Sequence, residues 1–268
     1  MPGDLPLAPL LESPFFEWGA LALGLIGGSF ANVCIHRLPR RQSVGLPPSS
    51  CPRCGARIRP WDNVPVLSYL LLRGRCRGCR APISMRYPLV ELANGAAYCA
   101  LAVLMGPTPR TFAMMALVTA LIVLSLIDLE WQILPNVITI PGVVLGLLAS
   151  LLPGPPTTLG ALGAAVGGYV ALMALALAWK RFRRVDALGQ GDWKMTAMLG
   201  AFLGWQGMVL AVFLASVLGT LVGLALIAFA GRTREHKLPL GTFLGLAGIV
   251  VVFVGEPVLA WYRGLLHG

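Results

Sequence analysis

Charge is scarce in this chain of 268 residues: 12% of the residues are charged, whereas 57% are hydrophobic. Apolar stretches near the roughly 20 residues needed to cross a bilayer recur along the whole sequence. We therefore expect an all-α polytopic membrane protein. The predicted spans lie at residues 15–35, 88–105, 111–128, 134–152, 157–179, 194–205, 208–230 and 240–262. Only Gly204 and Gly207 separate the sixth span from the seventh, so seven spans are the alternative to eight.

Three further features are absent from the sequence, and each absence argues against a type of segment, metal site or architecture. No lysine or arginine precedes the first span, so the N-terminal segment lacks the positive region of a signal peptide, and we expect this span to be retained. His36, His236 and His267 are isolated and suggest no histidine metal site. The two halves of the chain show no internal repeat, which argues against the repeat architecture of many transporters.

Positive charge is concentrated in the loop 36–86, which holds eleven arginines and a single acid, Asp62. Cytoplasmic loops of membrane proteins are rich in lysine and arginine, so we expect this loop in the cytoplasm. Counting alternately from there, the basic clusters at 180–184 and 232–237 also fall inside, and both termini fall outside. Nucleic acid or anionic lipid would be another partner for these arginines. Orientation in the membrane explains the charge without either, so we expect no nucleic-acid partner.

Two aspartates stand at the ends of apolar spans: Asp128 closes the third, and Asp192 closes GQGD before the sixth. The expected topology places both on the cytoplasmic side. A carboxylate at the edge of hydrocarbon costs about 2.5–3.5 kcal/mol on insertion scales, which makes it a functional-site hypothesis. Two carboxyls about 3 Å apart share one proton, so one activates a water while the other protonates an amide carbonyl. Pairing with arginine or lysine, or transport of protons or cations, are the alternatives.

Residues near the aspartates fit the same hypothesis. Gly189 and Gly191 allow close backbone approach at the start of a helix, where the helix dipole favours negative charge. Pro135 is expected to shape the turn after Asp128. A GxGD sequence alone is a weak signal because four residues with one wildcard occur often by chance. Glu91, at the start of the second span, is expected to orient the loop 36–86 or to pair with an arginine.

Four cysteines of the loop, Cys51, Cys54, Cys76 and Cys79, have the spacing C-x2-C-x21-C-x2-C. Each pair stands in a knuckle-like sequence, and four thiolates form a closed structural zinc site. A pair of disulfides is the alternative, and a reducing cytoplasm argues against it. The other two cysteines, Cys34 and Cys99, lie in predicted spans and are expected to be small core residues.

Five segments, in this order, resemble the type IV prepilin peptidases, which are GxGD intramembrane aspartyl proteases. They are GGSFANVCIHRLPR (27–40), the cysteine-containing segment 51–91, LIDLEWQILPN (126–136), GQGDWKMTAMLGAFLG (189–204) and LPLGTFLGLAG (238–248). Three positions depart from the family pattern: Asp186 stands where Glu is expected, Asn136 stands where Asp is frequent, and LPLGT replaces LPFGP. None of these departures removes Asp128 or Asp192.

The resemblance implies a protease with a first helix (1–35), a zinc domain (36–87) and a transmembrane catalytic domain (88–268). Its implied substrates are prepilins and pseudopilins of type IV pilus and type II secretion systems, cut at the cytoplasmic face of the bacterial inner membrane. Members of the family commonly also methylate the new N-terminal residue from S-adenosylmethionine. The loop 36–86 shows no fingerprint for that cofactor, so its binding residues stay unassigned. A leader peptidase without methyltransferase activity is one alternative.

Overall fold

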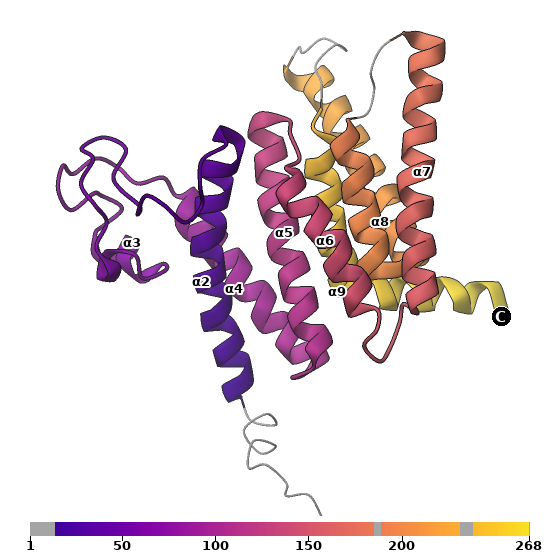
Figure 1. Ribbon diagram of the computed structural model, residues 1–268, viewed down its shortest axis with the longest axis horizontal. Coiled ribbons are helices and arrows are strands. Elements are labelled where there is room, and N and C mark those ends of the chain that lie inside the picture. Colours follow the sequence, from indigo (N-terminus) through magenta and orange to yellow (C-terminus); the bar gives the residue numbers. More distant parts are fainter. Residues whose placement is uncertain (1–13, 185–188, 231–237, 268) are drawn as a thin grey trace, which may run out of the picture. The chain divides into compact units, whose positions relative to one another are not determined.

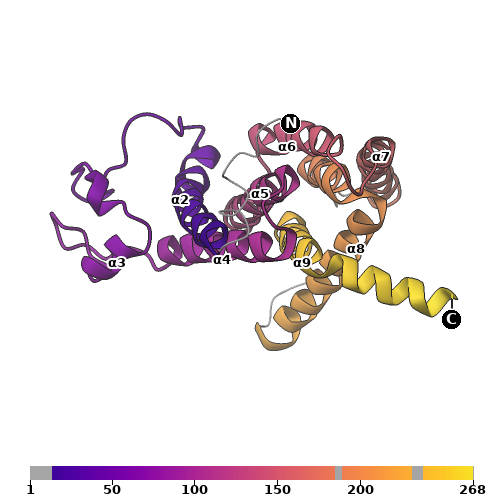
Figure 2. The same cartoon turned by 90° about the horizontal axis from the view of Figure 1, so that it is seen from below.

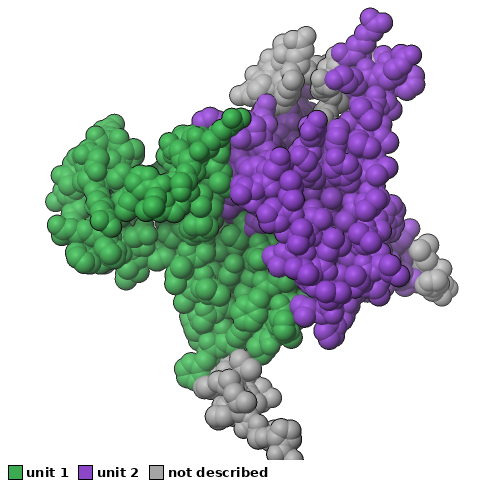
Figure 3. All heavy atoms as spheres, viewed as in Figure 1, with its two compact units in different colours: residues 1–119 green, residues 120–268 purple. Residues whose placement is uncertain are grey.

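The computed structural model describes residues 14–184, 189–230 and 238–267, and the regular elements among them are helices. They form two compact units, residues 1–119 and 120–268 (Figure 3). The segment before residue 14, Asp186, and the predicted basic cluster at 232–237 with His236 lie outside the described residues. The predicted all-α membrane fold is confirmed.

The first unit is built on α2 (Phe15–Arg37) and α4 (Arg86–Met105), which pack closely because glycines of α2 face α4. A Cβ on Gly28 would lie 2.6 Å from the Glu91 Cα, and one on Gly24 would lie 2.8 Å from the Asn94 carbonyl oxygen. In lipid, where no hydrophobic force drives helices together, small residues allow this approach. The buried Asn94 amide donates from Nδ2 to the Gly24 carbonyl at 2.7 Å. These contacts fix the register of the two helices.

The chain between α2 and α4 is a long loop with three short helices, η1 (Leu38–Arg40), η2 (Pro60–Asp62) and α3 (Leu67–Leu71). It holds the four cysteines and nine of the eighteen arginines. Because the loop has so little regular structure, it needs other bonds to hold its shape, and these are described with the cysteine site below.

The second unit contains the last part of α5 (Pro109–Trp131) together with α6 (Asn136–Ala149), α7 (Thr158–Arg183), α8 (Gln190–Ala230) and α9 (Leu240–His267) (Figure 1). The first part of α8 packs against both α6 and α7. A Cβ on Gly200 would lie 2.7 Å from the Ala164 carbonyl oxygen of α7, and one on Gly146 of α6 would lie 2.8 Å from the Ala201 Cβ. Small residues on α6, α7 and α8 thus let these helices pack closely.

Helix α8 turns back on itself at Gly204, whose φ of 67° and ψ of −172° interrupt the helix. A positive φ favours glycine, and a Cβ here would also lie 2.9 Å from the Pro156 Cβ. Both arms lie beside α9 (Figure 2). Their contacts show that the first arm runs in the same direction as α9 and the second in the opposite direction. The contacts are Met195 with Gly245 and Leu199 with Gly248 on the first arm, and Gly207 with Val251 and Gly219 with Phe243 on the second.

Six described helices are long and apolar enough to cross a membrane: α2, α4, α5, α7, α8 and α9. Helix α8 counts once among them, although its two arms correspond to two predicted spans, and α6 has only 14 residues. Each of the eight predicted apolar segments is helical in the structure, and the predicted separation near Gly204 coincides with the break in α8. The chain is therefore an integral membrane protein.

Candidate functional site

Two turns of matching geometry bring the four loop cysteines together. In the first, the Cys51 N–H donates to the Ala56 carbonyl at 2.9 Å, and the Cys51 carbonyl accepts from the Gly55 N–H at 2.9 Å. Cys76 makes the equivalent bonds in the second turn. Gly55 and Arg80 each follow the second cysteine of a pair, and both have positive φ, 70° and 59°. The repeated C-x2-C sequence thus folds into the same turn twice.

The cysteine sulfurs are spaced for a metal ion and not for disulfides. The four Sγ atoms lie within 4.8 Å of one another, and those of Cys51 and Cys79 are 3.8 Å apart. Sulfurs bound at about 2.3 Å to a tetrahedral zinc ion lie about 3.8 Å apart, whereas a disulfide needs about 2.05 Å. Backbone N–H groups of Cys54 and Arg53 lower the pKa of Cys51 to about 6, which favours the metal-binding thiolate. The cluster can hold a metal ion, and its four thiols suit zinc.

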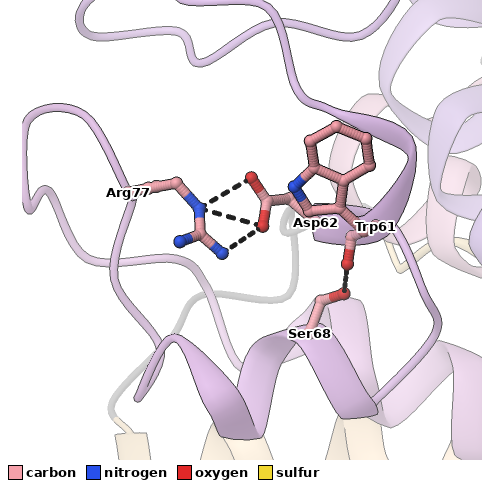
Figure 4. Close-up of polar contacts among 4 residues, drawn as sticks. All are labelled: Trp61, Asp62, Ser68 and Arg77. Atoms are coloured by element: carbon pink, nitrogen blue, oxygen red, sulfur yellow. Dashed lines mark hydrogen bonds and ion pairs between the residues drawn. The ribbon is translucent and has the colours of Figure 1, made fainter.

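An ion pair joins the second cysteine turn to the rest of the loop. Arg77 donates to the Asp62 carboxylate from Nη2 at 2.6 Å and from Nε at 2.9 and 3.0 Å (Figure 4). These hydrogen bonds hold the pKa of Asp62 below its usual value. Ser68 Oγ donates to the Trp61 carbonyl at 3.0 Å, which ties α3 to η2. The single acid of this arginine-rich loop therefore links the second cysteine turn to η2, which Ser68 in turn joins to α3.

In the second unit, Asp128 lies near the end of α5 and is only 5% exposed. Thr242, in the first turn of α9, donates its N–H to Asp128 Oδ2 at 2.8 Å. The Thr242 hydroxyl lies 3.0 Å from the Ser125 carbonyl and 3.4 Å from the same Asp128 oxygen. Gly241 admits this contact, because a Cβ there would lie 2.9 Å from Asp128 Oδ2. The positive end of the α9 dipole therefore faces the carboxyl group.

Asp192 lies in the first turn of α8 and is 8% exposed. The Gly189 N–H donates to Asp192 Oδ2 at 3.0 Å, and the Asp192 N–H donates to the Gly189 carbonyl at 3.1 Å. A side chain at Gly191 is excluded because its Cβ would lie 2.7 Å from the Leu134 Cβ. Each glycine of the GxGD sequence thus has a physical role: Gly189 supplies a donor, and Gly191 makes room for Leu134.

Leu134 links the surroundings of the two aspartates. Its side chain fills the space beside Gly191, next to Asp192, and beside Gly241, which borders Asp128. The structure therefore brings together the two aspartates that the sequence singled out.

The turn between α5 and α6 completes this region. Pro135 stands at the N-cap of α6, where its carbonyl accepts the N–H groups of Ile138 and Thr139 at 3.1 and 3.2 Å. Asn136 accepts a hydrogen bond from Lys194 Nζ at 2.9 Å, which joins the first residue of α6 to the second turn of α8. Sequence reasoning assigned no role to Thr242, Gly241 or Leu134. The family-like segments LPLGT and LIDLEWQILPN contain these three residues, but neither segment indicated their contacts with the aspartates or the GxGD glycines.

Comparisons with known proteins place the chain in a family. Residues 115–224 match the type IV leader peptidase family, and residues 22–105 match the bacterial peptidase A24 N-terminal domain. The prepilin leader peptidase/N-methyltransferase of Burkholderia pseudomallei strain 1026b is 39% identical over 264 residues, covering 89% of this chain and 85% of the relative. The proteins of the same name from Pseudomonas putida and Pseudomonas aeruginosa PAO1 are 37% identical over 282 and 283 residues, covering 96% of this chain and 96% and 98% of the relatives. No solved structure matches the chain. The chain therefore belongs to the type IV leader peptidase family.

Proposed function

We propose that this chain is an intramembrane aspartyl endopeptidase in which Asp128 and Asp192 catalyse removal of the leader peptide from type IV prepilins and pseudopilins. The observation that carries the proposal is the pair of buried carboxyls on α5 and α8, each bound by one backbone N–H. The substrate class follows from the relatives, which are named prepilin leader peptidases. The arginines of the loop 36–86 support a site at the cytoplasmic face of the bacterial inner membrane.

The two carboxyls have different roles in the proposed hydrolysis, one as a general base and the other as a general acid. We expect the two carboxyls to share one proton in the complex with substrate, so that the ionised carboxyl takes a proton from a water while the protonated one donates to the carbonyl oxygen of the scissile amide. The N–H groups of Thr242 and Gly189 each hold one carboxyl oxygen and thus fix the direction in which the group faces. The supporting residues Gly189, Gly191 and Pro135 shape the backbone that presents the pair.

The four cysteines hold a structural zinc ion that keeps the domain 36–87 folded. Four thiolates fill a tetrahedral site and leave no position for water or substrate, so this metal takes no part in hydrolysis. The relatives are also named N-methyltransferases. We extend that activity to this chain, with S-adenosylmethionine as the methyl donor and the new pilin N-terminus as the acceptor.

The purified protein in lipid vesicles, mixed with a prepilin and S-adenosylmethionine labelled in its methyl group, tests the proposal. We expect a shortened pilin that carries the label at its new N-terminus. Cleavage without label would favour a peptidase that lacks methyltransferase activity. An intact prepilin would contradict the peptidase, and proton or cation flux through the vesicles would then support a transporter.

Thr242 is expected to raise the cleavage rate through its two contacts with Asp128. Thr242→Val keeps the N–H donor and removes the hydroxyl, so the cleavage rate should fall about two- to tenfold. Thr242→Pro removes the N–H as well, and hydrogen bonds to charged groups are stronger, so the rate should fall about tenfold to a hundredfold. Proline is tolerated in the first turn of a helix, so α9 should still form. Initial rates on one prepilin give both values.

Thr220→Val is the matched control for the Thr242 variants. The Thr220 hydroxyl donates to the Ser216 carbonyl at 2.7 Å on an exposed part of α8, away from the aspartates. This variant should cleave like the wild type. Wild-type rates in Thr242→Pro would show that the α9 donor does not support Asp128.

A further inference from the structure

Glu91 is a buried acid with no cationic partner among its contacts. It lies in the second turn of α4, a membrane-spanning helix, and is 8% exposed. Its Oε2 accepts the Val66 N–H at 2.7 Å, and the Ser29 side chain supplies a second hydrogen bond. In the described residues it forms no ion pair with arginine, lysine or histidine. Glu91 therefore contacts the loop, which is one of its two expected roles. Its carboxyl group has no counter-ion at a position where a charge is costly.

The loop residue that contacts Glu91 has a strained backbone. Val66 has φ 61° and ψ −49°, and the Leu67 N–H donates to the Pro65 carbonyl at 2.5 Å, which closes a γ-turn around it. This region of dihedral space is unfavourable, above all for a β-branched residue. Such strain persists only where the surroundings hold it, and it is concentrated at ligand sites. Here the bond from Val66 to the Glu91 carboxylate holds the turn.

A second acceptor lies in the same interface between α2 and α4. Asn32 is 2% exposed and donates from Nδ2 to the carbonyls of Gly28 and Tyr87 at 3.2 and 3.1 Å. Its Oδ1 atom is buried and has no hydrogen-bond partner in the structure. Gly28 packs directly on Glu91, and Tyr87 lies one turn before Glu91 on α4. Asn32 and Glu91 thus offer two acceptors on adjacent turns, and a buried unpaired acceptor calls for a donor.

We propose that Glu91 and Asn32 bind the α-ammonium group of the newly exposed pilin N-terminus and that Glu91 prepares it for methylation. This role rests on the methyltransferase activity proposed above. An ammonium group carries N–H donors and no acceptor. A carboxylate without a counter-ion and an amide oxygen without a donor are complementary to it in both charge and hydrogen bonding.

Methyl transfer begins when the bound ammonium group loses a proton. An N–H bond of the ammonium breaks, the proton forms an O–H bond on the Glu91 carboxylate, and the nitrogen keeps the electron pair. That pair attacks the methyl carbon of the S-adenosylmethionine sulfonium, so an N–C bond forms while the C–S bond breaks. The sulfur keeps the bonding electrons and leaves as a neutral thioether. The product nitrogen is a secondary ammonium, and Glu91 holds the proton until it passes to water.

The test pairs one substitution with one change in the substrate. Glu91→Gln removes the charge, while its amide oxygen can still accept the Val66 N–H and keep the loop in place. Two pre-cleaved pilins are compared, one with a free N-terminus and one acetylated, which has no ammonium group. In the wild type, acetylation should weaken binding at least about tenfold. Glu91→Gln should bind both pilins alike, and its methyl transfer to the free pilin should fall at least about a hundredfold.

Cleavage of an intact prepilin and zinc content, measured in the same Glu91→Gln preparation, should stay at wild-type values and so report an intact fold. Glu17→Gln, which removes a carboxyl at the other end of α2, should methylate normally. The proposal is overturned if Glu91→Gln distinguishes the two pilins as strongly as the wild type does. A raised KM for S-adenosylmethionine alone would also overturn it, because the methyl donor would then contact Glu91. Failure of the wild type to methylate the free pilin would instead reject the methyltransferase activity itself, and this site with it.

Discussion

Leader cleavage is expected to fall at least about a thousandfold in Asp128→Asn, and as far in Asp192→Asn, because a pair of carboxyls that shares a proton stops working when either partner cannot titrate. Asparagine has nearly the shape of aspartate, and its amide oxygen can still accept the N–H of Thr242 or Gly189. The substitutions therefore change the chemistry more than the packing. Single-turnover cleavage of a prepilin in vesicles, with the variant in excess, measures the loss.

Glu256→Gln is the matched control for these variants. Its carboxyl also lies on a membrane helix, α9, but its side chain is 72% exposed, and we expect wild-type cleavage. Membrane abundance and thermal stability of all three variants should match those of the wild type. Near wild-type cleavage by either asparagine variant would refute the aspartyl mechanism.

The double variant Cys51→Ser/Cys79→Ser is expected to lose its zinc, from one ion per chain toward zero, and to expose the domain 36–87 to protease. Structural zinc sites contribute about 10–16 kcal/mol of apparent binding free energy, which in small domains is folding free energy. The loop has only short helices and isolated bridges among its described residues, so little else can replace that contribution. Elemental analysis and limited proteolysis measure the two effects.

The double variant should affect the two proposed activities differently. Methyl transfer should be lost, because the unfolded loop would no longer place Val66 against Glu91, whereas part of the cleavage activity should remain, because the aspartates need no metal. Cys34→Ser provides the control: this cysteine lies in α2, outside the cluster, and zinc content should be unchanged. One zinc ion per chain in the double variant would rule out the four-cysteine site. Rapid loss of cleavage on chelation, with the loop still resistant to protease, would point to a catalytic metal instead.

The fold class could be predicted from the sequence because the signals are local. The length of an apolar run shows directly whether it can span a membrane. The residues of a C-x2-C pair are themselves the residues that form its turn. The break in α8 was also visible locally, since Gly204 is where the positive φ occurs. The extent of α6 was not: the apolar run 134–152 is longer than the helix, which begins only after Pro135 and ends at Ala149. How the helices pair depends on contacts between distant positions, which no local pattern contains.

Some residues of the candidate site could likewise be predicted from the local sequence, and others could not. Asp128 and Asp192 stood out because a carboxyl within an apolar sequence is conspicuous by itself. Thr242 did not, because its role depends on Asp128, 114 residues earlier in the chain. In the sequence Thr242 was only a departure from the LPFGP pattern. In the structure it supplies an N–H, a group that proline lacks, to the carboxyl that we propose as catalytic.

The short helix α6 has a consequence for the lipid around the protein. Its 14 residues extend about 21 Å, whereas the hydrocarbon core of a bilayer is about 30 Å thick. A hydrophobic segment shorter than the core is accommodated partly by local thinning of the bilayer. Since α6 begins directly after Leu134 and Pro135, beside the aspartates, we expect thinning there to shorten the path by which water reaches a peptide bond in the membrane. We therefore expect the thickness of the surrounding bilayer to affect the supply of water for the proposed hydrolysis.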